Sequence, residues 1–79
     1  MRITYYAAAA DAAGTATVDV DDTARTAGEL LEQLGRGNER LAGTLPVCTL
    51  LVDGAPVRES DALIPAGARV DVLPPFAGG

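Results

Sequence analysis

The sequence ends in RVDVLPPFAGG (residues 69–79), and this stretch decides the architecture expected for the chain. Polar and apolar residues alternate from residue 69 to 73, which is the period of a strand with one buried face. Val70 and Val72 share that face. Pro74 has no backbone N–H to donate to a sheet, so the strand must stop there. The pattern therefore predicts a last strand over residues 69–73, followed by a separate tail.

The geometry of this tail suits entry into a deep site on another molecule. The rings of Pro74 and Pro75 each fix φ near about −65° and hold the exit of the tail extended. Gly78 and Gly79 lack a Cβ, so their backbone can lie against a surface without steric cost. The tail residues, when extended, reach roughly 20 Å.

Two interpretations of the tail compete. A pair of terminal glycines is often no more than a frayed end. The placement of one aromatic residue, Phe76, between rigid prolines and a bare glycine terminus favours a functional segment instead. We therefore divide the chain into a domain over residues 1–73 and an extended functional tail over residues 74–79.

The main helix has a clear start signal. Thr26 stands three residues before Glu29, the spacing of a capping box. The spacing of the apolar residues that follow predicts a helix over residues 27–34. The stripe consists of Ala27, Leu30, Leu31 and Leu34. Gly35 comes at a natural stop position, and one further turn beginning at Asn38 is expected after it.

Alternation and turn signals predict the remaining strands. The expected strands cover residues 2–8, 15–20, 47–52 and 55–57. The run from Val47 to Val52 is apolar on both faces, which predicts a central strand. Pro56 confines its own segment to an edge. The turns are expected at Asp53-Gly54 and at residues 65–67, directly after Leu63 and Ile64.

The segment from Ala7 to Ala13 is ambiguous, because consecutive alanines suit a helix better than a strand. We expect a loop or bulge there, ending at Gly14. Together the segments predict an α+β fold in which a mixed sheet of four to five strands packs on one main helix.

Composition excludes several classes of function. The chain has 79 residues, a formal net charge of −5, one cysteine and no histidine. One cysteine permits neither an internal disulfide nor an iron–sulfur cluster, and Cys/His zinc sites need histidine as well. The negative charge argues against nucleic acid, whose phosphates require basic residues. Because no apolar run approaches the length of a membrane span or a signal peptide, we expect a cytoplasmic protein.

Few side chains of the predicted domain suggest chemistry of their own. Cys48 has apolar neighbours and no histidine to activate it, so we interpret it as a packed strand residue. Tyr5 and Tyr6 are interpreted as core and rim. The acidic cluster Asp19, Asp21 and Asp22 lacks the rest of a calcium loop and indicates a solvated strand end. We expect no metal site and no catalysis by the chain alone.

The ending Pro-Pro-Phe-Ala-Gly-Gly resembles that of the MoaD/ThiS sulfur-carrier family, which includes the small subunit of molybdopterin synthase. Residues 52–57, 63–70 and 5–14 are also similar to that family, so the resemblance covers almost the whole chain in the right order. It implies a ubiquitin-like β-grasp in which the first and last strands lie side by side.

The resemblance also implies a role for the tail. In such carriers an E1-like enzyme uses ATP and magnesium to adenylate the C-terminal carboxylate, here that of Gly79. Sulfur from a donor protein then displaces AMP and leaves a thiocarboxylate, which the large subunit of molybdopterin synthase or another synthase consumes. No cofactor would be bound by this chain itself. The residues expected to contact partners are Leu73, Pro74, Pro75, Phe76, Ala77 and Gly78.

Three alternatives stay open at this point. The sequence departs from many relatives at Ala10 and at residues 67–70, so the sulfur could serve thiamin, cysteine or another sulfur-containing metabolite instead of molybdopterin. A second class of function is a ubiquitin-like modifier that is conjugated to proteins through Gly79. A third is a plain binding module whose tail is incidental.

Overall fold

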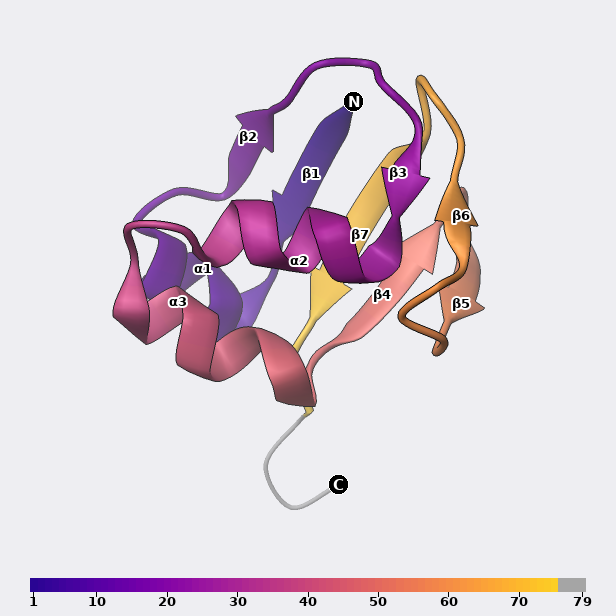
Figure 1. The fold of residues 1–79 in the computed structure, drawn as a ribbon. Helices are drawn as coiled ribbons and strands as arrows, with labels where there is room; N and C mark the ends of the chain where they lie inside the picture. The colour runs from indigo at the N-terminus through magenta and orange to yellow at the C-terminus, as the bar shows by residue number, and fades with distance from the viewer. Residues whose placement is uncertain (76–79) are drawn as a thin grey trace.

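The computed structural model describes residues 1–75, and a five-stranded sheet forms its centre (Figure 1). The strand order is β2-β1-β7-β4-β5. The strands are β1 (Arg2–Tyr5), β2 (Thr17–Asp19), β4 (Thr49–Val52), β5 (Ala55–Val57) and β7 (Arg69–Leu73). The last strand, β7, lies in the middle, parallel to β1 and antiparallel to β4. The expected pairing of the first and last strands is confirmed.

Helices cover one face of this sheet, and a small second sheet closes one side (Figure 1). The helices are α1 (Ala7–Ala13), α2 (Ala27–Gly35), α3 (Glu39–Thr44) and the 3-10 helix η1 (Leu45–Val47). The second sheet pairs β3 (Arg25–Thr26) with β6 (Leu63–Ile64). The predicted α+β fold, with a mixed sheet on one main helix, is therefore confirmed.

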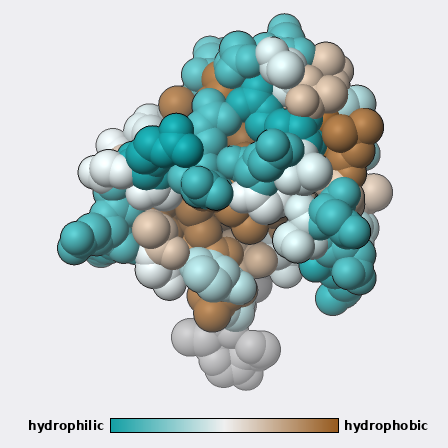
Figure 2. All heavy atoms as spheres, in the orientation of Figure 1, coloured by the Kyte–Doolittle hydropathy of each residue, from teal (hydrophilic) through white to brown (hydrophobic). Residues whose placement is uncertain are grey.

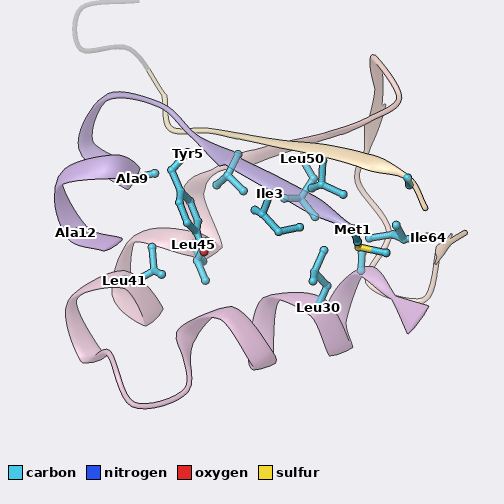
Figure 3. Packing of buried hydrophobic residues seen from close by; sticks show 14 residues of the cluster. Met1, Ile3, Tyr5, Ala9, Ala12, Leu30, Leu41, Leu45, Leu50 and Ile64 are labelled. Atoms are coloured by element: carbon cyan, nitrogen blue, oxygen red, sulfur yellow. The ribbon is translucent and has the colours of Figure 1, made fainter. Parts of the chain in front are cut away.

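The core lies between the sheet and α2 (Figure 3). Ile3 of β1 is aligned with Val70 of β7, and both side chains are fully buried, as is Val72. Leu30 of α2 is fully buried against them. The alternation of the last strand therefore predicted its inward face correctly.

The predicted capping box begins α2. The Glu29 amide donates to the Thr26 hydroxyl oxygen at 3.1 Å, and the Thr26 amide donates to the Glu29 carboxylate at 2.8 Å. The helix runs one residue further than expected and includes Gly35. A Cβ on Gly35 would lie only 3.0 Å from the Cβ of Ala42 in α3. This glycine therefore allows α2 and α3 to approach closely and does not stop the helix.

The strand expected over residues 2–8 and the loop expected over residues 7–13 were both wrong. The first strand ends at Tyr5, and residues 7–13 form α1. Ala9 and Ala12 are buried in the core, and Gly14 ends the helix in the left-handed region with φ 77°. The helix propensity of alanine, combined with burial of this small face, decides the conformation.

The predicted central strand over residues 47–52 also required correction. The strand β4 begins only at Thr49, because Val47 belongs to the 3-10 turn η1, which starts at Leu45 and contains Pro46. The Val47 residue is 62% exposed. The strand β4 pairs with β7 on one side and with β5 on the other, so it is an interior strand as predicted, while β7 holds the middle position. An apolar run shows burial of its strand but does not fix the strand order.

The other connections agree with the predicted turns and caps. Asp53 and Gly54 have φ values of 50° and 85°, so both adopt the positive φ of a tight hairpin turn between β4 and β5. Asn38 caps α3 by accepting a hydrogen bond from the Leu41 amide at 3.0 Å. The strand expected over residues 15–20 is shorter than predicted and spans only β2.

Candidate functional site

The base of the predicted tail lies at the end of the central strand. Leu73, the last residue of β7, is aligned with Thr49 of β4. On the other side, the Tyr6 amide donates to the Val72 carbonyl at 3.1 Å. Pro74 is buried and Pro75 is exposed, so the chain leaves the fold between these two residues. Both neighbouring strands therefore anchor the point from which the tail departs.

The structure describes three of the seven predicted site residues. Leu73 is half-buried at the strand end and is followed by the buried Pro74 and the exposed Pro75. The other predicted site residues lie outside the described residues. They are Phe76, Ala77, Gly78 and Gly79. The strand β7 ends at Leu73 and Pro74 is still buried on the folded body, while the division into a domain and a tail stays a prediction.

The outer face of the sheet, opposite the helices, carries polar residues near this exit. The Tyr6 hydroxyl lies 3.4 Å from a carboxylate oxygen of Asp71, two residues before the end of β7. Arg69 on the same strand places its Nε 3.9 Å from that carboxylate. The sequence predicted Tyr6 as a rim residue. Its contact with Asp71 could not be predicted from a local pattern, because 65 positions separate the two residues.

Apolar surface extends over the helix side near the exit of the chain. A groove of about 460 Å³ runs between α2 and the segment formed by α3 and η1. Its lining consists of Leu31, Glu32, Gly35, Arg36, Ala42, Leu45 and Pro46. Figure 2 shows hydrophobic residues gathered in this lower central region and hydrophilic residues around it. This groove is open and has few polar groups, which does not suit catalysis within the domain.

Cys48 lies at the end of η1, immediately before β4. It is half-buried, and its Sγ lies 3.3 Å from the Thr44 carbonyl oxygen. Burial raises the pKa of this thiol, which disfavours the nucleophilic thiolate at neutral pH. The interpretation of Cys48 as a packed residue is confirmed, although its position is before the strand and not in it.

Each aspartate of the acidic cluster has a cationic partner. Asp19 binds the Arg2 guanidinium at 3.1 Å, and Asp21 binds that of Arg25 at 2.9 Å. Asp22 contacts the N-terminal ammonium of Met1. These carboxylates therefore contribute to ion pairs at the surface, and within residues 1–75 no group of three metal-binding side chains comes together.

No helix among residues 1–75 has the length and apolar character required to cross a membrane.

A protein-family comparison matches residues 3–79 to the ThiS family. The chain belongs to the ThiS family. This ThiS-family match extends through the tail as well as the domain. Among curated protein sequences, none matches the chain significantly.

Solved structures with the same fold support this assignment. The HVO 2177 protein of Haloferax volcanii is 30% identical, with a TM-score of 0.74, over 99% of this chain and 84% of that one. SAMP1, also from Haloferax volcanii, is 26% identical, with a TM-score of 0.76, over 99% and 97% of the two chains. Its fold and that of this ThiS-family chain are the ubiquitin-like β-grasp expected from the sequence.

A third solved structure shares the fold at lower identity. The putative molybdopterin converting factor, subunit 1, of Pyrococcus furiosus is 19% identical, with a TM-score of 0.75. The match covers 95% of both chains. The β-grasp architecture of this ThiS-family chain therefore occurs both in the putative molybdopterin converting factor subunit and in SAMP1, which is named as a small archaeal modifier protein.

Proposed function

We propose that this chain is a sulfur carrier whose Gly79 carboxylate is adenylated by an E1-like enzyme and converted to a thiocarboxylate. The observation that supports this proposal best is the family match through residue 79, combined with anchoring of the strand end that precedes the tail. The β-grasp domain holds the base of the tail firmly, and no catalytic group of its own is required.

The chemistry follows from the weakness of a carboxylate as an electrophile. A carboxylate oxygen of Gly79 attacks the α-phosphorus of ATP in the partner, pyrophosphate leaves, and an acyl adenylate forms. A sulfide nucleophile from a donor protein then attacks the carbonyl carbon. The new C–S bond forms as the C–O bond to AMP breaks. Magnesium and ATP belong to the partner, and the chain contributes only its C-terminus.

We assign the sulfur to molybdopterin biosynthesis, with the large subunit of molybdopterin synthase as the acceptor. The fold shared with the Pyrococcus furiosus protein supports this choice. Thiamin, cysteine or another sulfur-containing metabolite is the alternative destination. In each case the leading role of the folded body is to present Leu73, Pro74 and Pro75 in a fixed direction, while Phe76 anchors the tail in the partner.

A second candidate function is conjugation to other proteins through Gly79. It is favoured by the likeness to SAMP1, which is named as a small archaeal modifier protein. The two functions differ in their products. Intact mass spectrometry of protein from its native host would show replacement of one oxygen by sulfur on a free carrier. A modifier would instead appear as adducts with many proteins.

The sharpest test of the carrier function is deletion of Gly79. The carboxylate then retreats by roughly 3.5 Å, whereas the reacting atoms tolerate a misplacement of only about 1 Å. We expect no ATP–pyrophosphate exchange with the cognate adenylating enzyme. Gly78→Val should also nearly abolish exchange, because a branched side chain must enter a passage shaped for bare backbone.

The control is thermal unfolding of the same proteins. Both changes lie beyond the folded body, so the melting temperature should match that of the wild type. Exchange at the wild-type rate by the Gly79 deletion would refute the proposed function.

A further inference from the structure

The outer face of the sheet contains a buried carboxylate that the chemistry of the tail does not use. Asp71 belongs to the central strand, and its side chain is only 12% exposed. Among residues 1–75, Asp71 is the only charged residue in the buried class. Removing a carboxylate from water is costly unless strong hydrogen bonds or ion pairs replace the lost hydration.

The contacts of Asp71 within the domain are long. The Tyr6 hydroxyl oxygen is 3.4 Å away, whereas hydrogen bonds of this kind usually measure about 2.5–3.0 Å. Arg69 Nε is 3.9 Å away, and the Arg69 side chain is 71% exposed. The strand neighbours of Asp71 on either side are Thr4 and Leu51, which offer no charge. The carboxylate is thus prepared for a stronger cationic partner than the fold supplies.

The surroundings of Asp71 have the composition of an interface centre. Tyr6 is 38% exposed, and its amide bonds to Val72 next to the strand end. Leu51 and Leu73 are half-buried on the same face. We call Tyr6, Leu51, Asp71 and Leu73 the outer-face cluster. Aromatic and apolar groups around one desolvated charge are typical of interface residues that contribute most to binding.

We propose that Asp71 receives an arginine or lysine side chain of the adenylating enzyme, which docks on the outer-face cluster. This inference rests on the proposed function. Continuity supports it, because Asp71 lies two residues before the strand end from which the tail departs. Charge supports it as well. Arg2 on this face lies 3.1 Å from Asp19, whereas the cation that pairs with Asp71, the exposed Arg69, lies 3.9 Å away.

Direct binding to the cognate adenylating enzyme without ATP tests this inference. Asp71→Asn preserves the shape of the side chain and its ability to accept from Tyr6, but it removes the charge. We expect Kd to rise about tenfold or more, because a buried charge on the partner loses its counterion. In ATP–pyrophosphate exchange, the KM for this chain should rise by the same factor as Kd, and kcat should stay unchanged. The matched control is Asp61→Asn, at an exposed position in the connection between β5 and β6, and it should leave both constants unaltered.

Salt dependence separates an ion pair from a structural effect. The Kd of the wild type should rise with salt more steeply than that of Asp71→Asn. Equal slopes, or an unchanged Kd in a variant that melts like the wild type, would overturn the inference.

A second variant keeps the test valid if Asp71→Asn does not fold. Tyr6→Phe removes the internal hydrogen bond but retains the charge, so its Kd should equal or fall below that of the wild type. A tenfold weakening by Tyr6→Phe would show that the partner needs the Tyr6 hydroxyl and not a free Asp71. If binding behaves as expected but the wild type supports no exchange, the proposed function fails and the docking role of Asp71 stands. If the wild type does not bind, both fail.

Discussion

Ala7 has a left-handed backbone at the junction of β1 and α1, with φ 50°. This region costs a residue with a Cβ about 1–2 kcal/mol, whereas glycine adopts it readily. We expect Ala7→Gly to raise the free energy of unfolding by about 0.5–1 kcal/mol. This is less than the full relief of strain, because the greater entropy of glycine in the unfolded chain offsets part of the gain. Chemical denaturation measures the change.

The neighbouring residue provides a matched control for Ala7→Gly. Ala8 lies in the same helix without a positive φ. Ala8→Gly should therefore destabilise the fold by about 0.5–1 kcal/mol. Destabilisation by both variants would show that the junction is not strained.

Within the elements, the two adjacent leucines of α2 should differ in their contribution to stability. Leu30 is fully buried between α2 and the sheet, whereas Leu31 is half-buried and lines the groove. Leu30→Ala should cost about 2–5 kcal/mol because it leaves a cavity in the core. Leu31→Ala should cost clearly less, because water can enter the groove. If both variants lose the same free energy of unfolding in urea denaturation, the helix does not face the core in the orientation described.

Among the elements, the sequence correctly predicted the features that depend on neighbouring residues. The capping box, the alternation of β7 and the Asp53-Gly54 turn each depend on a few neighbouring residues, and each was found where it was expected. The helix α1 was missed because a run of alanines has little amphipathic contrast.

Long-range contacts account for the remaining errors. The short strand β3 forms through pairing with the distant β6, and Asp71 is covered by Tyr6 from the opposite end of the chain. The predicted site residues Leu73, Pro74 and Pro75 lie at the expected strand end, whereas the functional roles of residues 73–79 stay predictions. The sequence could not predict the proposed role of Asp71 in binding a partner. Alternation along a strand places every polar residue of this kind on the outer face, whether or not a partner binds there.

For the whole molecule, the stability should decrease in acid. Hydrogen bonds from the Thr26 backbone and side chain lower the pKa of Glu29, and those from Arg2 lower that of Asp19. The fold thus favours the ionised forms. Their contribution is complete above the unfolded pKa values, about 4, and is lost as pH falls through the lower folded values. We expect the melting temperature to fall below about pH 4.

Substitution of Glu29 checks the origin of this acid sensitivity. Glu29→Gln should flatten the decrease in melting temperature between about pH 5 and pH 2. Glu59→Gln is the control, because within residues 1–75 the Glu59 side chain makes no hydrogen bond of its own, and its decrease should follow the wild type. An unchanged slope for Glu29→Gln would contradict the assignment.

The central position of β7 has a mechanical consequence for a protein that is held by its end. The strand departs directly into the tail and lies parallel to β1, near the opposite terminus. A force between the N-terminus and the tail would therefore act along the two strands and across their hydrogen bonds, in shear, so that many bonds must break together and not one after another. The folded body of the chain is therefore expected to resist extension when the strand end that leads into the tail is pulled.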